Sequence, residues 1–561
     1  MTQSGADLFV DCLEQYDVTH LFGNPGTTEL PVMEALGDSE AIDYVLGLHE
    51  DAAVGAAAGY AQTRRYQDDA TGGEQVGVVN LHVTPGLAHG LGNLYDASVS
   101  GAPMVVTTGD HATDFRHEEP ILQGDLLKLA EQFCKWSAEV SDASTIPAMV
   151  RRAFRVALTP PTGPVFLALP MDAMMAETDD EPQRLGAIPD AGRGDPDQVA
   201  AVADALVDAD QPVLVVGDGV ARSGEDAVDA VVELAEATGA RVHTEILASE
   251  VDFPSDHDQF VSPIPPTENL ASMLLNSDTL CFVGCSTNTT LWRHENPLVP
   301  DHATCVHVSQ DAWEVGKNEP ADAAVIGDPG RVCAELADQV AGRVSDDDLE
   351  SRLDHVASTR DMVGGQMASM GEDDAPDDPR SSKAELVDAV RDAAPDAYVV
   401  DEAVTTKFAL LTRWDFAPES YIANKGGGLG YGLPAAVGAA LAEDQAGTDR
   451  PTVAVIGDGS YLYYPQAIYG AIQHGLDLTV VVPNNQNYRI LKDNTNQIFG
   501  GDDADHDYVG MDIEPPVDIV RSAESYGALG VRAEGPDELE GAVAEALDHD
   551  GVSVLDALVH D

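Results

Sequence analysis

The chain has 561 residues and a formal net charge of −69, because 98 acidic residues stand against 29 basic ones. This charge argues against nucleic acid and anionic membranes as partners, since both would be repelled. Apolar residues make up 44% of the chain, which excludes a disordered acidic polymer and leaves room for about three folded domains. A highly acidic, lysine-poor surface predicts a soluble protein of a high-salt cytoplasm, and neither an apolar signal segment nor a membrane-spanning run is visible.

Three polar groups follow apolar runs near the N-terminus. A turn over residues 22–31 reads Phe-Gly-Asn-Pro-Gly-Thr-Thr-Glu-Leu-Pro and presents the hydroxyl of Thr27. At Glu50 an apolar strand gives way to a predicted helix of small residues, where the helix dipole alone would also favour an acid. A further apolar strand over 76–81 ends at His82. A histidine at a strand end beside that helix is a candidate for proton transfer.

Two linkers divide the chain. The first, over about 177–197, is rich in Asp, Pro and Gly, and the second, over about 344–379, is acidic and only loosely periodic. Between them a strand over 213–216 leads into a Gly-Asp-Gly turn that lacks both a downstream Asn-Asn pair and a GxGxxG fingerprint. This predicts a Rossmann-like strand end without a bound metal or FAD. A later strand, over 279–283, leads into a loop that carries His294.

The C-terminal part carries the most informative motif. A strand over 453–456 runs into Gly457-Asp458-Gly459-Ser460, and a second strand over 478–482 runs into Asn484-Asn485. A parallel crossover places both strand ends at one edge of a sheet. There the oxygens of Asp458 and Asn485 suit Mg²⁺ carrying a phosphorylated ligand. The alternative is a tight turn followed by an Asn-rich loop. A glycine-rich segment over 426–432 would let backbone approach a ligand closely.

Together these segments resemble the thiamine diphosphate (ThDP) enzymes of the decarboxylase and acetolactate synthase family. The Asn-Pro-Gly turn, the Asn80-Leu81-His82 strand end and residues 161–170 are most similar to the benzoylformate decarboxylase branch. The resemblance spans nearly the whole chain and is weakest between about 185 and 380. It implies an α/β fold of three doubly wound, Rossmann-like parallel-sheet domains. The expected domains are pyrimidine-binding over 1–180, central over 195–343 and diphosphate-binding over 380–561.

The resemblance also implies roles for individual residues. Glu50 matches the acid that activates the cofactor at atom N1′ of its pyrimidine ring. His82 matches a histidine that relays protons, and Thr27 stands where the branch has a serine that contacts the substrate carboxylate. His294 matches a second catalytic histidine, but its loop is about three residues longer than in the branch, so both readings stay open.

ThDP and Mg²⁺ are the cofactors that the resemblance implies, and FAD is not expected. Leu429 matches the apolar residue that holds ThDP in its bent shape, and the Gly427 carbonyl matches the acceptor of its amino group. The remaining matching positions of the cofactor site are Glu402, Thr405, Gly428, Gly457, Asp458, Gly459, Ser460, Asn485 and Tyr488. The expected metal ligands are Asp458, Asn485 and Asn487.

The function implied is non-oxidative decarboxylation of a 2-oxo acid to an aldehyde and CO₂. An acetolactate synthase-like carboligase, for which a flavin would be expected, and a non-catalytic ThDP-fold binding subunit are the alternatives. Asn494 stands where an aromatic residue lines the benzoylformate pocket, although Leu491 fits an apolar lining position, so benzoylformate itself is disfavoured. In the family, Glu50 and Asp458 would meet across a subunit interface, which predicts a homodimer or homotetramer.

Overall fold

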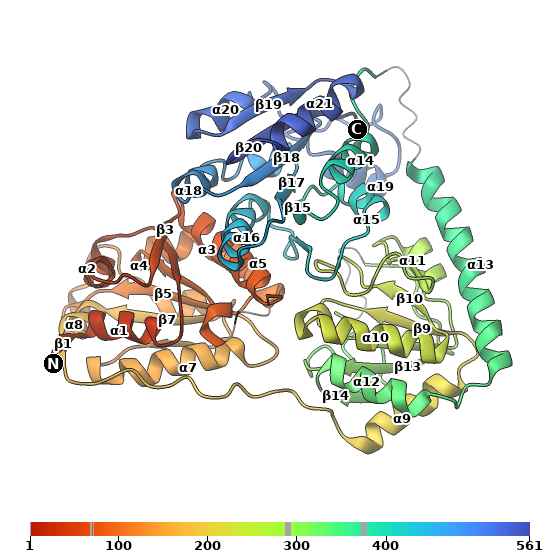
Figure 1. The fold of residues 1–561 in the computed structure, drawn as a ribbon, viewed down its shortest axis with the longest axis horizontal. Coiled ribbons are helices and arrows are strands. Elements are labelled where there is room, and N and C mark those ends of the chain that lie inside the picture. Colours follow the sequence, from red (N-terminus) through yellow and green to blue (C-terminus); the bar gives the residue numbers. More distant parts are fainter. Residues whose placement is uncertain (1, 68–69, 71, 287–292, 372–377) are drawn as a thin grey trace. The chain divides into compact units, whose positions relative to one another are not determined.

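The computed structural model describes residues 2–67, 70, 72–286, 293–371 and 378–561. Its described strands form three six-stranded sheets and one two-stranded sheet (Figure 1). By their contacts the residues divide into two compact units: one holds Met1–Ile188, Ala375–Trp414 and Gly426–Asp561, and the other Pro189–Asp374 and Asp415–Lys425. The predicted class, three parallel-sheet α/β domains, is confirmed. The domain boundaries stay a prediction.

The N-terminal sheet has the strand order β3-β2-β4-β5-β7-β6. These strands are β2 (His20–Gly23), β3 (Asp43–Leu46), β4 (Gly77–Leu81), β5 (Met104–Asp110), β6 (Ser137–Glu139) and β7 (Val165–Pro170). Strands β4, β5 and β7 are buried along their whole length, as expected where helices cover both faces of a parallel sheet. The short strands β1 (Gln3–Ser4) and β8 (Glu177–Thr178) pair antiparallel.

The helices of this part alternate with its strands. They are α1 (Gly5–Glu14), α2 (Leu30–Gly37), α3 (Glu50–Arg64), α4 (Val83–His89), α5 (Leu91–Val99), α6 (Leu126–Ala130), α7 (Ile146–Leu158) and α8 (Met171–Met175). Helix α1 begins with a capping box, in which Ser4 and Asp7 each accept from the other's backbone N–H. Strand, helix and parallel strand therefore follow one another as right-handed crossovers require.

The C-terminal sheet has the order β16-β15-β17-β18-β20-β19. Its strands are β15 (Tyr398–Glu402), β16 (Tyr421–Ala423), β17 (Thr452–Ile456), β18 (Leu478–Asn484), β19 (Leu529–Ala533) and β20 (Val552–Leu558). Its helices are α14 (Lys383–Ala393), α15 (Lys407–Arg413), α16 (Gly432–Ala446), α17 (Asp458–Tyr461), α18 (Ala467–Gln473), α19 (Arg489–Phe499), α20 (Ile519–Tyr526) and α21 (Pro536–Leu547). The predicted crossover from β17 to β18 is present, with Val453 paired to Thr479.

Helices α3 and α16, both rich in small residues, pack closely within the first unit. A Cβ atom at Gly438 would lie 1.8 Å from the carbonyl oxygen of Ala56, and one at Gly59 would lie 2.2 Å from that of Ala435. Only glycine permits such an approach of two backbones. This contact fixes the position of α3 and with it the first residue of the helix, Glu50.

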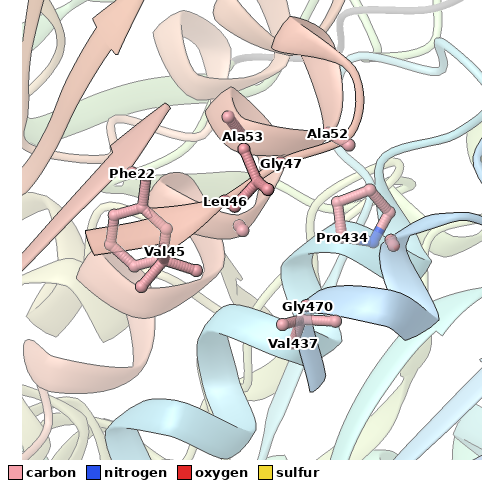
Figure 2. A pocket seen from close by; sticks show the side chains of 11 residues that line it. Phe22, Val45, Leu46, Gly47, Ala52, Ala53, Pro434, Val437 and Gly470 are labelled. Atoms are coloured by element: carbon pink, nitrogen blue, oxygen red, sulfur yellow. The ribbon is translucent and has the colours of Figure 1, made fainter. Parts of the chain in front are cut away.

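Next to this contact lies a small apolar pocket (Figure 2). Phe22 and Val45 close one side, while Pro434 and Val437 of α16 and Gly470 of α18 form the other. Its volume of about 20 Å³ is close to the space that a single water needs. The pocket is therefore a gap in the packing, and a cofactor-sized ligand does not fit it.

The central sheet, in the second unit, has the order β11-β10-β9-β12-β13-β14. Its strands are β9 (Pro212–Val216), β10 (Arg241–Thr244), β11 (Phe260–Pro263), β12 (Thr279–Val283), β13 (Thr304–Ser309) and β14 (Ala323–Ile326). Its helices are α9 (Pro196–Asp208), α10 (Glu225–Thr238), α11 (Glu268–Leu274), α12 (Pro329–Val340) and α13 (Asp346–Gly371). None of the helices within the described ranges combines the length and apolarity that a membrane span requires.

Helix α13 corrects the prediction of a loosely structured second linker. It is 26 residues long, and it begins where Ser345 Oγ accepts from the backbone N–H of Asp348 at 3.2 Å. The guanidinium of Arg352, which is buried, donates to the carbonyls of Thr238 at 2.7 Å and Val207 at 2.9 Å. Apolar residues do recur at helical spacing along it, as with the buried Val356 and Val363, but the acidic composition of the segment led to its assignment as a linker.

Candidate active site

A pocket opens at the carboxyl ends of β15, β17 and β18. Its described lining residues are Glu402, Ala403, Val404, Thr405, Thr406, Leu429, Gly457, Asp458, Gly459, Ser460, Pro483, Asn485, Asn487, Tyr488, Arg489 and Ile490. The structure thus brings together the predicted cofactor-binding residues except Gly427 and Gly428, which are outside this described lining. A Cβ atom at Gly459 would lie 2.5 Å from Cε1 of Tyr488, so glycine is needed there for the tyrosine to reach the pocket.

The predicted metal ligands lie side by side on the turns after β17 and β18. Asp458 Oδ2 accepts from the backbone N–H of Gln486 at 2.8 Å, and Gln486 itself has a φ of +61°, a strained conformation that often marks functional sites. Burial raises the pKa of Asp458 to about 6. Asn487 Oδ1 is buried without a hydrogen-bond partner in the described part of the chain. A buried carboxylate and an unsatisfied amide oxygen fit a hard cation such as Mg²⁺.

Asp561 forms hydrogen bonds to the side-chain amides of both asparagines among the predicted metal ligands. Its Oδ1 accepts from Nδ2 of Asn485 and from Nδ2 of Asn487, each at 2.9 Å. Of the two amide oxygens, that of Asn485 accepts from the backbone N–H of Asn487 at 3.3 Å, which leaves Asn487 Oδ1 as the unpartnered one within the described residues. Asp561 was not predicted, because it is 76 residues from Asn485 in the sequence and belongs to no motif.

Glu402 organises the glycine-rich segment. Its carboxylate accepts from the backbone N–H of Gly430 at 2.8 Å and of Gly432 at 2.7 Å. Gly427 has a φ of +73°, which disfavours any residue with a side chain. Glu402 therefore shapes the backbone beside Leu429, in addition to lining the pocket.

Glu50 is the first residue of α3 and lies against α4. Its Oε2 is 3.1 Å from Nδ1 of His89. A Cβ atom at Gly86 would lie 3.3 Å from Glu50 Oε1 and 3.0 Å from Cβ of His82, so this glycine separates the two predicted catalytic residues. His89 was not predicted. The sequence offered no signal for it, because His89 ends the short helix α4 outside every motif.

His82 is held by a carboxylate that sequence reasoning missed. Its Nδ1 lies 2.8 Å from Oε2 of Glu29, whose side chain is fully buried. The carboxylate places the ring hydrogen on Nδ1 and leaves Nε2 as the atom able to exchange protons. Glu29 also accepts from the backbone N–H groups of Val83 at 3.1 Å and Gly109 at 2.8 Å. This ties His82 to the ends of two strands.

The Asn-Pro-Gly turn packs directly on His82. A Cβ atom at Gly26 would lie 1.9 Å from Nδ1 of His82, so the turn is held against the imidazole. Thr27 follows on this turn and is exposed. The structure therefore brings Thr27, His82 and Glu50 to one edge of the N-terminal sheet.

His294 belongs to the second unit. Its Nε2 lies 3.3 Å from the carbonyl oxygen of Pro266, and its catalytic role stays a prediction. In the same unit, the central Gly-Asp-Gly turn places Asp218 within 2.7 Å of Lys425 and 3.2 Å of Arg222. This carboxylate is thus neutralised by cationic side chains of the protein.

The fold and the two groups of polar residues define a ThDP enzyme, and comparison with known proteins agrees. Family models of the thiamine pyrophosphate enzymes match the N-terminal TPP binding domain at residues 3–131, the central domain at 199–336 and the C-terminal TPP binding domain at 405–557. The benzoylformate decarboxylase of Pseudomonas aeruginosa is 31% identical over 543 residues, covering 96% of this chain and 95% of that protein. The chain therefore belongs to the thiamine diphosphate-dependent enzyme family.

Other relatives include both decarboxylases and synthases. Acetolactate synthase isozyme 3 large subunit of Escherichia coli is 27% identical over 554 residues, covering 97% of this chain and 92% of that protein. Among solved structures, the 4-hydroxybenzoylformate decarboxylase of Rhodococcus jostii has a TM-score of 0.85 at 28% identity, covering 100% of this chain and 99% of that one. The benzoylformate decarboxylase of Polynucleobacter necessarius has a TM-score of 0.86 at 26% identity, with the same coverage.

Proposed function

We propose that the protein is a ThDP- and Mg²⁺-dependent carboxy-lyase that converts a 2-oxo acid to an aldehyde and CO₂. The observation that carries this proposal is the arrangement at the edge of the N-terminal sheet. There His82, held by the buried carboxylate of Glu29, lies across Gly86 from Glu50. A histidine held by a buried acid is suited to proton transfer at the substrate, which decarboxylation to an aldehyde requires.

Each residue has a defined task in this proposal. When bound, ThDP supplies the nucleophilic carbon and accepts the electrons of the broken carbon–carbon bond. Glu50 exchanges a proton with N1′ of the pyrimidine ring. Thr27 donates its hydroxyl hydrogen to the substrate carboxylate and so orients it. His82 exchanges a proton through Nε2 with the carbonyl oxygen of the substrate. A proton then takes the place of the lost CO₂ on the carbonyl carbon, and the aldehyde leaves.

The C-terminal pocket would hold the diphosphate and its metal. Asp458, Asn485 and Asn487 are the proposed ligands of Mg²⁺, because their oxygens include a buried carboxylate and an unpartnered amide oxygen. Glu402, Thr405, Gly427, Gly428, Leu429, Gly457, Gly459, Ser460 and Tyr488 are the proposed cofactor contacts. Mg²⁺ would offset part of the negative charge of the diphosphate and of Asp458.

The substrate side chain is proposed to differ from the phenyl group of benzoylformate. Asn494 and Leu491 both belong to helix α19, which follows the metal turn. An amide at the position where the branch has an aromatic residue favours a substrate with a polar or aliphatic side chain. His294 remains the second proposed proton carrier.

A carboligase is the second candidate, and the similarity to acetolactate synthases over nearly the whole chain favours it. In that reaction a second 2-oxo acid, instead of a proton, would be added after CO₂ has left. A non-catalytic ThDP-fold subunit is the third candidate. The retained Glu50, Asp458 and Asn485 oppose it.

We further propose a homodimer or homotetramer in which each site is shared between subunits. All described lining residues of the diphosphate pocket lie between positions 402 and 490, whereas Glu50, His82 and Thr27 come from the N-terminal domain. A complete site needs both groups. The net charge of −69 supports a cytoplasm rich in salt, where screening reduces the repulsion between acidic side chains.

Release of CO₂ tests the proposal. Purified protein in molar KCl with ThDP and Mg²⁺ is given a panel of aromatic, aliphatic and polar 2-oxo acids, beside Glu50→Gln and the matched surface control Glu34→Gln. We expect release with at least one acid, about 10²-fold slower in Glu50→Gln and unchanged in Glu34→Gln. Bound ThDP without release from any acid of the panel would favour the binding subunit instead.

A further inference from the structure

Four arginines surround one hollow in the N-terminal domain. Arg151, Arg152 and Arg155 lie on α7, and Arg184 lies on the segment that follows β8. The hollow has a volume of about 520 Å³, and Gln183, Leu185 and Gly186 complete its described lining. We call it the arginine hollow. The acids at positions 179–181, just before it in the sequence, are absent from that lining.

The four guanidinium groups are exceptional in so acidic a chain. Other arginines pair with carboxylates, as Arg343 does with Asp204 at 2.6 Å and Arg521 with Asp518 at 3.3 Å, or with backbone carbonyls, as Arg352 does. In the part of the chain that the structure describes, no ion pair joins Arg151, Arg152, Arg155 or Arg184 to an acidic side chain. All four are exposed. The four positively charged guanidinium groups therefore lie around one hollow without an acidic partner among the described residues.

Both segments that line the arginine hollow are fixed by contacts with the rest of the N-terminal domain. The hydroxyl of Tyr16 donates to the carbonyl of Gln183 at 2.7 Å, and the ring of Tyr16 meets that of Phe154, on α7, at 5.0 Å. Leu185 packs against the hydrophobic core of the domain. The segment that carries Arg184 is thus tied to the helix that carries the other three arginines.

The charges of the arginine hollow repel one another. Arg151 and Arg155 are four apart on one helix, where like charges are neighbours and destabilise the helix. Among the described residues that line the hollow there is no acidic side chain to offset the repulsion. A bound anion would replace this repulsion between the arginines with attraction to the anion. Guanidinium groups bind phosphate oxygens through paired hydrogen bonds. The volume lies within the usual range for small-molecule sites.

We propose that the arginine hollow binds a small multivalent phosphate anion, of the class of pyrophosphate and nucleoside polyphosphates. Its lining residues lie between positions 151 and 186, whereas the diphosphate pocket is lined by positions 402–490. The hollow is therefore a second anion site, independent of the proposed decarboxylase activity.

Calorimetry with pyrophosphate tests this proposal. Protein saturated with ThDP and Mg²⁺, and freed of excess ligand, is titrated in KCl beside Arg151→Gln/Arg155→Gln and the control pair Arg343→Gln/Arg521→Gln. We expect saturable binding of one pyrophosphate per chain, about tenfold or more weaker in the hollow variant, unchanged in the control pair, and weaker as KCl rises. Extraction of Mg²⁺ by pyrophosphate would contribute equally in all three proteins.

The single variant Arg184→Gln covers the case in which the double variant fails to fold, because Arg184 lies outside helices and strands. It should also weaken binding. Equal affinity in wild type and hollow variants, or no saturable binding, would overturn the proposal. So would sedimentation that shows the hollow variants losing self-association without pyrophosphate, because the arginines would then face an acidic surface of a second copy.

Discussion

The buried carboxylate of Glu29 decides how His82 can act. It accepts from three backbone N–H groups, those of Gly26, Val83 and Gly109, and lies 2.8 Å from Nδ1 of His82. An acid that is held so firmly keeps the imidazole in one orientation and one tautomer. Glu29 is therefore a positioning residue for the proposed proton transfer.

We predict that Glu29→Gln lowers kcat about 10²-fold, because the amide no longer stabilises the protonated imidazole. The affinity for ThDP should stay at the wild-type value, since Glu29 is remote from the diphosphate pocket in the sequence and absent from its described lining. Steady-state kinetics and calorimetric ThDP binding check the two expectations. An unchanged kcat in a folded variant would show that Glu29 does not position a catalytic His82.

Asp561 plays a comparable part among the proposed metal ligands. Because its Oδ1 accepts from the amides of Asn485 and Asn487, we predict that Asp561→Asn weakens Mg²⁺ binding by about 10- to 100-fold, the usual effect of losing an outer partner of metal ligands. Titration of Mg²⁺ in the presence of ThDP measures this. The exposed Asp550, which lies at the other end of β20, supplies the control Asp550→Asn, and equal Mg²⁺ affinity in both variants would contradict the prediction.

At the scale of elements, helices α3 and α16 make the closest backbone approach found at any described glycine. Gly438→Ala should destabilise the fold by about 1–3 kcal/mol, because its Cβ atom would overlap the backbone of Ala56. Gly470, on α18, is a matched contrast: its Cβ atom would meet nothing nearer than 3.6 Å. Gly470→Ala should therefore stabilise by about 0.5–1 kcal/mol. Denaturant midpoints of both variants check the opposite signs.

Elements differed in how far the sequence predicted them. Strands β17 and β18 are continuous apolar runs that end in polar motifs, and parallel pairing brings those ends together, so Asp458 and Asn485 line one pocket. Their role as metal ligands stays a prediction. Helix α13 was missed because its sequence is acidic, although Val356 and Val363 are buried at helical spacing, and because the carbonyl contacts of Arg352 are not visible in the sequence. Glu29 and His82 are 53 residues apart, and only the folded sheet makes them partners.

At the scale of the whole molecule, the site is divided between two groups of residues. If each site combines Glu50 of one subunit with Asp458 of another, two inactive variants should restore one another. Glu50→Gln and Asp458→Ala, dissociated and reassociated together, should regain about one quarter of wild-type activity, because half of the dimers are mixed and half of their sites intact. Each variant reassociated with itself should stay inactive. No recovery in mixed dimers would place the site within one chain.

The fate of the substrate carbon distinguishes a decarboxylase from a carboligase. Using the 2-oxo acid that gives the fastest ThDP-dependent release of CO₂, the measurement is the amount of aldehyde, of acetohydroxy acid and of 2-oxo acid consumed for each CO₂. For a decarboxylase we expect one aldehyde formed and one 2-oxo acid consumed per CO₂. An acetohydroxy acid, with two molecules of 2-oxo acid consumed per CO₂, would contradict this expectation and identify the protein as a carboligase.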